Sequence, residues 1–359
     1  MKKKSNRPRV GTLGAGQLAL MLAEAGRKIG VEVVCAGTPG DCAGRVAPLI
    51  PVDLKDAAQV AAFARECDVV TIETENIDVA VLKDVNVLPS ARAIGIAQDR
   101  LPEKRFFRDC GIDTAPFVPV ESEDDLRRAL EMVGLPSILK TRRMGYDGKG
   151  QVRLTKADQA LAAWESLGRV PCVLEGFVRF ESEVSLIAAR NKGGDMVFWP
   201  LTENFHRDGI LRCSVAPFYD ETLQRRAEVC MISLLEKMDY VGVLAVEFFL
   251  TGDQLAANEM APRVHNSGHW TIEGSKTSQF ENHLRAILGM ELGSTESTGT
   301  VMLNCIGTMP PESETKEFQS LWRHDYGKDP RPGRKVGHLT FPVTASRDIY
   351  EWQKRLGVV

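Results

Sequence analysis

The sequence lacks a long hydrophobic run, a strong net charge and any closely spaced pair of cysteines. No apolar stretch in its 359 residues approaches the roughly 20 residues that a bilayer-spanning helix requires, so we expect no membrane partner. The net charge of -3 gives no reason to expect nucleic acid as a partner, because nucleic-acid binders usually carry a concentrated basic surface. The eight cysteines are scattered without a CxxC pair, which predicts reduced thiols and a cytoplasmic location.

The first hundred residues have the pattern of an α/β domain, and the length of the chain suits two or three such units. A strand at 9–13 leads through a glycine turn into a helix from Gln17, and a second strand follows at 31–35. Further strands at 68–72 and 86–88 would extend a mostly parallel sheet. We therefore expect an N-terminal Rossmann-like domain.

Beyond residue 98 the pattern changes to that of an α+β lobe followed by a larger unit. The elements expected in the lobe are helices at 98–110, 124–133 and 157–167 and strands at 116–120, 137–140, 151–154, 172–178 and 181–189. In the larger unit we expect a helix at 222–238 and an apolar strand at 242–250. The final stretch is rich in glycine, proline and arginine.

The first glycine turn, Gly14-Ala15-Gly16, precedes a helix and so offers backbone amides to an anion. In dinucleotide-binding folds an acid at the end of the second strand usually accepts the ribose hydroxyls, whereas this strand ends at Cys35 and continues into Ala36. The missing acid argues against a nicotinamide cofactor. A structural turn and a site for another phosphate-bearing ligand both stay open.

A second glycine-rich loop lies between two predicted strands. Gly145, Gly148 and Gly150 fall within six positions, so the backbone there could close over phosphate oxygens. No GK[ST] sequence opens a helix after this loop, and nucleotide binding would have to rest on a sheet hairpin. Lys140, just upstream, would place a cation in the same cleft, although an ordinary hairpin with a solvated lysine is the alternative.

Two acids interrupt apolar sequence near residue 250. Glu247 stands alone in the strand at 242–250, and Glu259 follows beside Asn258. Because a buried carboxylate is costly and magnesium prefers carboxylate oxygens together with nucleotide phosphates, this pair predicts a magnesium site. A structural salt bridge for either acid is the alternative.

The segment after these acids is loaded with hydrogen-bond donors. Residues 261–270 hold Arg263, His265, Asn266, Ser267 and His269 between prolines and glycines. Loops of this kind usually meet an anion or a reacting group. The spacing of the two histidines could suggest zinc, but Pro262 and Gly268 oppose a regular helix and no HExxH is present.

Eight motifs together give the chain a resemblance over nearly its whole length. They are GAGQL at 14–18, TIETEN at 71–76, QDR at 98–100, GYDGKGQ at 145–151, EGFV at 175–178, ENFHRDGIL at 203–211, NEMAPRVHNSGHWT at 258–271 and RPGRKVGHL at 331–339. With them the chain resembles the N5-carboxyaminoimidazole ribonucleotide synthetase family of the ATP-grasp superfamily. The resemblance implies an ATP-grasp fold with a Rossmann-like (biotin-carboxylase-like) domain at 1–101, an ATP-grasp domain at 102–290 with its small lobe at about 115–180, and a small β-rich C-terminal domain at 291–359 that closes the substrate site.

The resemblance also implies a reaction. Members of this family carboxylate 5-aminoimidazole ribonucleotide to N5-carboxyaminoimidazole ribonucleotide in de novo purine biosynthesis, using ATP and bicarbonate and releasing ADP and phosphate by way of carboxyphosphate. The implied cofactors are ATP and magnesium, with manganese as a substitute. The implied small-molecule substrates are the imidazole ribonucleotide and bicarbonate, and the implied assembly is a homodimer.

Site residues follow from the resemblance position by position. The implied ATP site comprises Arg100, Lys140, Gly145, Tyr146, Asp147, Gly148, Lys149, Gly150, Gln151, Glu175, Gly176, Phe177, Val178, Glu183, His206, Asn258 and Glu259. The implied ribonucleotide site comprises Gln17, Leu18, Glu73, Asn76, Asn266, Ser267, Lys328, Arg334 and Lys335. The implied catalytic group is Tyr146, Asp147, Lys149, Arg263 and His265, and the implied metal ligands are Glu247 and Glu259. Either Asp147 or His265 could accept the proton of the amine.

The departures from the family pattern are small. Ala15 and Ala19 stand where the family often has glycine, and Val264 where it often has proline.

Three other interpretations of the function stay open. A sister ATP-grasp ligase, such as a formate-dependent glycinamide ribonucleotide transformylase or a D-alanine ligase, should lack RPGRKVGH and HNSGHW. A nicotinamide oxidoreductase would share only the first glycine turn, and a non-catalytic nucleotide-binding protein would release no ADP.

Overall fold

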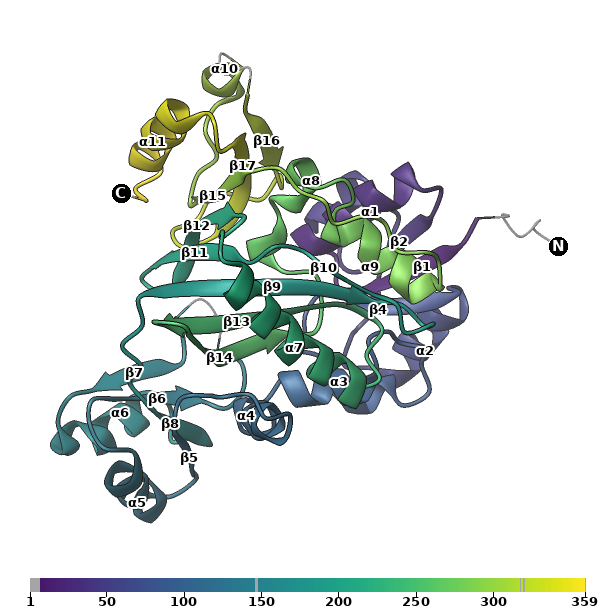
Figure 1. Cartoon of the computed structure of the whole chain (residues 1–359). Helices are drawn as coiled ribbons and strands as arrows, with labels where there is room; N and C mark the ends of the chain where they lie inside the picture. The colour runs from purple at the N-terminus through teal and green to yellow at the C-terminus, as the bar shows by residue number, and fades with distance from the viewer. Residues whose placement is uncertain (1–6, 146–147, 317, 319, 359) are drawn as a thin grey trace.

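Three sheets organise the part of the chain that the structure describes (Figure 1). The computed structural model describes residues 7–145, 148–316, 318 and 320–358. The predicted site residues Tyr146 and Asp147 therefore lie outside the described residues.

A small parallel sheet forms the N-terminal unit, with strands in the order β3-β2-β1-β4. Its elements are β1 (Arg9–Leu13), α1 (Gln17–Lys28), β2 (Glu32–Ala36), β3 (Leu49–Ile50), α2 (Ala57–Arg65) and β4 (Val69–Ile72). The predicted β-α-β unit is confirmed. The prediction of a strand at 86–88 is wrong, because Val87 makes only an isolated bridge to Val70. Pro89 follows directly and has no N–H to continue a ladder.

An antiparallel sheet in the order β5-β8-β6-β7 forms the small lobe. Two helices lead into it and six elements build it: α3 (Ala91–Ala97), α4 (Arg100–Asp109), β5 (Phe117–Val120), α5 (Glu123–Val133), β6 (Ser137–Thr141), β7 (Gln151–Leu154), α6 (Ala160–Ser166) and β8 (Cys172–Gly176). Helix α5 begins where the Ser122 hydroxyl accepts from the N–H of Asp125. The glycine-rich loop joins β6 to β7, as the predicted hairpin requires.

The third sheet is the largest and runs from the centre of the molecule into the C-terminal region (Figure 1). Its strands follow the order β14-β13-β9-β11-β12-β15-β17-β16, and β10 pairs with β9. The elements are β9 (Ser182–Arg190), β10 (Met196–Phe198), β11 (Thr202–Arg207), β12 (Ile210–Ala216), α7 (Glu221–Lys237), β13 (Gly242–Thr251), β14 (Gln254–Ala261), α8 (Thr271–Gly274), α9 (Gln279–Leu288), β15 (Thr300–Ile306), α10 (Glu312–Thr315), β16 (Trp322–Asp325), β17 (Lys335–Pro342) and α11 (Ser346–Arg355). Because β15 pairs with β12, the C-terminal strands continue the central sheet.

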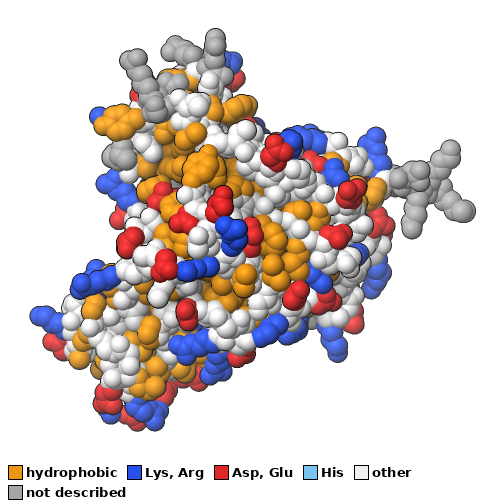
Figure 2. All heavy atoms as spheres, viewed as in Figure 1, with side chains coloured by type: hydrophobic (Ala, Val, Ile, Leu, Met, Phe, Trp, Pro, Cys, Tyr) orange, Lys and Arg blue, Asp and Glu red, His pale blue; other side chains and the backbone are white. Residues whose placement is uncertain are grey.

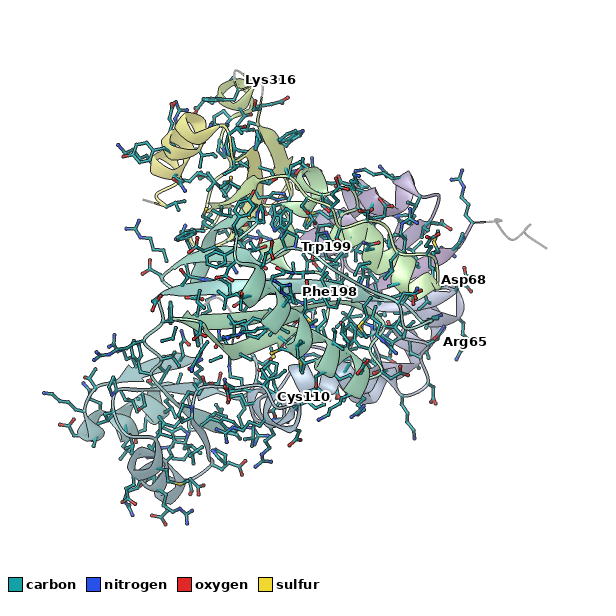
Figure 3. The ribbon with its side chains drawn as sticks, in the orientation of Figure 1. Arg65, Asp68, Cys110, Phe198, Trp199 and Lys316 are labelled. Carbon is teal, nitrogen blue, oxygen red and sulfur yellow. The ribbon has the colours of Figure 1, made fainter. Side chains whose placement is uncertain are left out.

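One apolar core connects the N-terminal unit to the central sheet. Helix α9 packs against both α1 and β13, and Leu22, Phe280 and Leu284 are buried in the same cluster. Trp199, labelled in Figure 3, is fully buried and donates from Nε1 to the carbonyl oxygen of Thr277 at 3.2 Å. The two units therefore meet across a continuous packed interior.

Surface charge, helix character and the state of the cysteines can be given for the described residues. Lys, Arg, Asp and Glu side chains are interspersed over the face seen in Figure 2. None of the helices in the described part of the chain combines the length and apolar character that a bilayer-spanning segment needs. All eight cysteines are free thiols, and five of them are buried.

Candidate active site

A cavity of about 810 Å³ lies where the N-terminal unit, the small lobe, the central sheet and the C-terminal segment meet. The predicted site residues that line it are Gln17, Leu18, Glu73, Asn76, Arg100, Gly145, Lys149, Glu247, Glu259, Arg263, His265, Asn266, Lys328, Arg334 and Lys335. Residues far apart in the sequence thus share one space. Cavities of this size at domain junctions are the usual place for small-molecule sites.

The two predicted metal acids face each other across paired strands. Glu247 on β13 lies opposite Glu259 on β14, so both side chains project from the same face of the sheet. Arg100 Nη1 lies 3.0 Å from Glu259 Oε2. Burial raises the pKa of a carboxyl group, but the Arg100 guanidinium outweighs burial and holds the pKa of Glu259 below its ordinary value. Burial and the neighbouring Glu259 charge raise the pKa of Glu247.

These oxygens fit a divalent cation. The Asn258 Oδ1 atom, next to Glu259 in the chain, is buried and has no hydrogen-bond partner among the described residues, although Asn258 does not line the cavity. Carboxylate and amide oxygens are the ligands that magnesium prefers.

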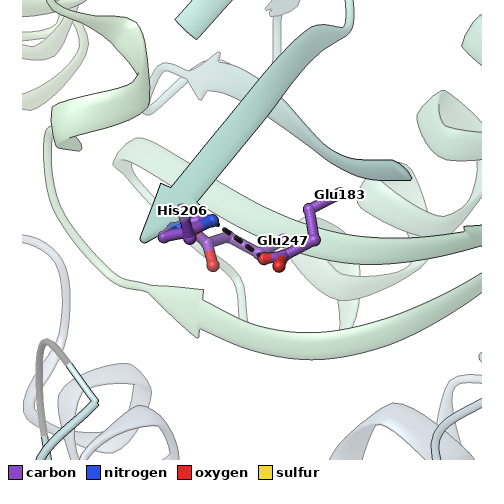
Figure 4. Close-up of side chains that lie close together, drawn as sticks. All are labelled: Glu183, His206 and Glu247. Carbon is purple, nitrogen blue, oxygen red and sulfur yellow. Dashed lines mark ion pairs between the residues drawn. The ribbon is translucent and has the colours of Figure 1, made fainter. Parts of the chain in front are cut away.

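A second cluster of possible metal ligands shares Glu247. Ligand atoms of Glu183, His206 and Glu247 lie within 4.8 Å of one another (Figure 4). His206 Nδ1 is 3.0 Å from Glu183 Oε2, and although burial lowers the pKa of the imidazole, the pair with Glu183 and the charge of Glu247 raise it overall. The cluster therefore sets a His206–Glu183 pair beside the acid pair of β13 and β14.

A buried carboxylate holds two lysines behind the glycine hairpin. Glu175 Oε2 lies 3.0 Å from Lys140 Nζ, and Glu175 Oε1 lies 3.2 Å from Lys104 Nζ. Burial raises the pKa of Glu175, but the two ammonium groups outweigh it and lower that pKa to about 2. Lys140 thus projects from the small lobe with its charge already paired, and it does not line the cavity.

The loop that follows β14 is fixed by paired contacts. Arg263 donates from Nε and Nη2 to the two carboxylate oxygens of Glu75. His265 Nδ1 lies 2.9 Å from the Ser267 hydroxyl, and its Nε2 lies 3.7 Å from Glu247 Oε1. Burial and the Arg263 charge lower the pKa of His265 to about 3, so its imidazole is neutral at pH 7. The zinc interpretation gains no support, because no metal cluster among the described residues contains His265 or His269.

The first glycine turn binds a carboxylate of the protein. Glu73, which follows β4, accepts from the N–H of Gly16 at 2.8 Å and from the N–H of Leu18 at 3.3 Å. A Cβ atom at position 16 would lie 2.2 Å from Glu73 Oε1. Of the two interpretations left open, the structural turn is therefore the one the contacts favour. Gln17 remains available to the cavity and accepts from Lys328 Nζ through its side-chain oxygen.

Other predicted residues stand outside the cavity lining, and some lining residues were missed. Those outside the lining are Lys140, Gly148, Gly150, Gln151, Glu175, Gly176, Phe177, Val178, Glu183, His206, Asn258 and Ser267. The polar lining residues that the sequence analysis did not single out are Thr74, Glu75, Gln98, Glu103, Arg142 and Arg331. The TIETEN motif contains Glu75, but no local signal connects that acid to Arg263.

Family models and known proteins match the chain over nearly all of its length. A ribonucleotide synthetase preATP-grasp domain matches residues 8–98, an ATP-grasp domain matches 105–280, and a phosphoribosylaminoimidazole carboxylase C-terminal domain matches 300–350. The chain is 47% identical over 338 residues to the N5-carboxyaminoimidazole ribonucleotide synthase of Pseudomonas aeruginosa, with 92% of this chain and 94% of that relative covered.

Solved structures agree with these matches. The crystal structure of N5-carboxyaminoimidazole ribonucleotide synthetase from Thermus thermophilus superposes with a TM-score of 0.91 and 46% identity, covering 97% of this chain and 98% of that one. The Aspergillus clavatus synthase in complex with ADP and 5-aminoimidazole ribonucleotide gives a TM-score of 0.89 and 29% identity, covering 98% of each chain.

The fold and the site therefore define an ATP-grasp ligase. Within that class, the chain belongs to the N5-carboxyaminoimidazole ribonucleotide synthase family of purine biosynthesis.

Proposed function

We propose that this chain uses ATP to carboxylate the exocyclic amine of 5-aminoimidazole ribonucleotide with bicarbonate, giving N5-carboxyaminoimidazole ribonucleotide, ADP and phosphate. The observation that carries the proposal is that one cavity joins three things: the glycine hairpin, the acid pair of β13 and β14, and the cationic segment at 328–335. A nucleotide and a phosphorylated substrate must bind in the same cavity, and these three features together offer contacts to both.

The first half-reaction transfers the terminal phosphoryl group of ATP to an oxygen of bicarbonate, forming carboxyphosphate and ADP. Such a transfer depends on positioning and on neutralising charge. Lys149 and Arg263 line the cavity, so cations approach the phosphates from both the lobe and the donor loop, whereas Lys140 stands outside the lining in its pair with Glu175. Residues 175–178 would hold the adenine at the start of the connection from β8 to β9.

Glu247 and Glu259 would hold magnesium, and manganese could substitute for it. When bound, the cation would neutralise charge on the nucleotide phosphates. Arg100 pairs with Glu259, and this contact keeps the carboxylate ionised and ready to ligate.

In the second half-reaction the amine nitrogen attacks the carboxyl carbon of carboxyphosphate. The carbon–nitrogen bond forms, the bond from that carbon to the phosphate oxygen breaks, phosphate leaves, and the amine loses a proton. The glycine hairpin would exclude water, which otherwise hydrolyses the intermediate. His265 is neutral and so could accept this proton, but burial makes it a weak base. Asp147, which lies outside the described residues, is the other candidate.

The ribonucleotide would lie between the N-terminal unit and the C-terminal segment. Gln17, Leu18, Glu73 and Asn76 line one wall of the cavity. Lys328, Arg334 and Lys335, from the opposite wall, would bind its phosphate, together with Asn266 of the donor loop, whereas the buried Ser267 lies outside the lining.

ADP release in a coupled assay tests this proposal. We expect release to require ATP, the imidazole ribonucleotide and bicarbonate together, and to fall to background when bicarbonate is withdrawn. Release that needs formate and glycinamide ribonucleotide instead would assign the chain to the sister ligase. A lack of nucleotide-dependent turnover with any of these substrates would favour a non-catalytic role.

We propose a homodimeric enzyme that works in the cytoplasm. Free, largely buried thiols and interspersed surface charges are compatible with that compartment. Sedimentation velocity should give one species of twice the chain's mass of 39.6 kDa. A monomer at micromolar concentration would contradict the dimer without affecting the assignment of the reaction.

A further inference from the structure

A β-bulge in β14 decides where Glu259, one of the two candidate metal acids, points. Glu247 lies opposite Glu259 in the ladder with β13, but the next residue, Phe248, lies opposite Ala257. Asn258 is therefore an extra residue that the ladder skips. An insertion of this kind reverses the alternation of the side chains that follow it along the strand.

The pattern of burial shows what the bulge achieves. Ala257 and Met260 both belong to the core cluster that contains Val246, although a regular strand would put residues three apart on opposite faces. An unbroken register from Ala257 would pair Glu259 with Val246 and turn its carboxylate into that core. The bulge is thus the reason that Glu259 faces the cavity beside Glu247.

Two buried side chains of α4 bind the backbone on either side of Glu259. Lys104 Nζ donates to the carbonyl oxygen of Asn258 at 3.3 Å, and Glu103 Oε1 accepts from the N–H of Met260 at 2.6 Å. Both side chains are at most 1% exposed. Because β14 lies at the edge of the sheet, no further strand among the described residues competes for these groups.

The same face of α4 also contacts the side chain between those two backbone groups. Arg100 precedes Glu103 and Lys104 by three and four residues, which places all three on one side of the helix. Its guanidinium pairs with Glu259 at 3.0 Å. Three consecutive residues of β14, at positions 258–260, are therefore fixed by one helical face.

We propose that Glu103 and Lys104 are positioning residues that hold the Asn258 bulge and so keep Glu259 facing Glu247. Neither residue touches a reacting group in this account. The inference rests on the proposed function only for the identity of the ligand that the two acids bind. The contacts of Glu103 and Lys104 with β14 are made within the chain and need no ligand.

The test compares Glu103→Met with Glu103→Gln. Glutamine keeps an oxygen that can accept from the N–H of Met260, whereas methionine fills a similar volume and offers only the weak acceptor of its thioether sulfur. In nucleotide-free protein, hydrogen–deuterium exchange of the segment 254–261 should be at least about tenfold faster in Glu103→Met and within about twofold of wild type in Glu103→Gln. Lys104→Met breaks the other contact together with the pair between Lys104 and Glu175, and it should act in the same direction on segment 254–261. It keeps the test open if Glu103→Met does not fold.

Binding of manganese with ADP, followed by electron paramagnetic resonance, gives a second readout. We expect the dissociation constant to rise about tenfold in the two methionine variants and to stay unchanged in Glu103→Gln. Arg105→Met is the matched control for Lys104→Met, because this exposed neighbour on α4 loses the same positive charge. Wild-type exchange in both methionine variants, or a crystal structure of either that keeps Glu247 opposite Glu259, would overturn the inference. Altered exchange in a protein whose wild type binds no manganese–ADP would support the inference and count against the proposed function.

Discussion

Arg263 and Glu75 form a two-point ion pair that ties the end of β14 to the loop after β4. Arg263 Nε donates to Glu75 Oε2 at 2.5 Å, and its Nη2 donates to Oε1 at 3.0 Å. Nη1 donates to the carbonyl oxygen of Val264, so the plane of the guanidinium is fixed in the cavity wall. The pair joins the N-terminal unit to the donor loop across the candidate active site.

Replacing Glu75 with alanine should leave the largely buried Arg263 charge without its partner. We expect the free energy of unfolding to fall by on the order of 2 kcal/mol and kcat/KM to fall at least about tenfold, because the guanidinium is no longer held in place. Urea unfolding and the ADP-release assay measure the two effects. Asp124→Ala, which breaks an exposed pair with Arg127, is the control and should change stability by less than about 0.5 kcal/mol. Equal losses in the two variants would contradict the role given to the buried pair.

Glu73 should make stability depend on pH. Burial raises its pKa in the folded chain above the ordinary value of 4.5, although the N–H groups of Gly16 and Leu18 act in the opposite direction. The folded chain therefore keeps a proton that the unfolded chain releases, so this contribution to stability is present below pH 4.5 and is lost as the pH rises through the folded pKa. Urea unfolding should show wild-type stability falling relative to Glu73→Gln over this window. A difference that is constant with pH would contradict the raised pKa.

Gly16→Ala should disrupt the first glycine turn. The added Cβ atom would lie 2.2 Å from Glu73 Oε1, which is far inside contact distance. We expect a loss of about 2 kcal/mol or more in stability, since the carboxylate must move away from the N–H groups it accepts from. Gly30→Ala is the matched control: its added atom meets nothing within 4 Å, and its positive φ of 73° should cost only about 1 kcal/mol. Calorimetric unfolding of the two variants measures this difference in stability. A Gly16→Ala variant as stable as Gly30→Ala would contradict the prediction, because it would show that the turn can accommodate the added atom.

Lys328→Met should weaken ribonucleotide binding selectively. Lys328 lines the cavity and reaches Gln17 across the boundary between the C-terminal segment and the N-terminal unit. Losing a charge-assisted contact to a phosphate should raise KM for the imidazole ribonucleotide about tenfold or more while leaving KM for ATP within about twofold. The control is Lys316→Met, an exposed lysine paired with Glu312. An equal rise in both KM values would place Lys328 outside the ribonucleotide site.

The sequence predictions are correct for elements whose contacts lie close together in the chain. The β-α-β unit and the hairpin around the glycine loop follow from apolar periodicity and turn residues, and both are present. Glu73 could not be placed on the first turn in this way, because its partners at Gly16 and Leu18 are more than fifty residues away. Its carboxylate occupies amides that the sequence alone left free for a ligand.

The sequence also does not predict the buried charges of α4. It predicts a charged helix at 98–110, but a lysine on an amphipathic helix usually lies in solvent, so nothing in the sequence indicates that Lys104 pairs with Glu175. The bulge at Asn258 does leave a trace, since Ala257 and Met260 are apolar at a spacing of three. That trace can be interpreted only when the register with β13 is known.

The central claim is that ATP phosphorylates bicarbonate before the amine attacks, and isotope transfer tests it most directly. Turnover with oxygen-18-labelled bicarbonate should place one labelled oxygen in the phosphate released with each ADP, because the bond that breaks joins the carboxyl carbon to a former bicarbonate oxygen. Mass spectrometry of the phosphate reads this out. Unlabelled phosphate, formed at the same rate as N5-carboxyaminoimidazole ribonucleotide, would contradict the account.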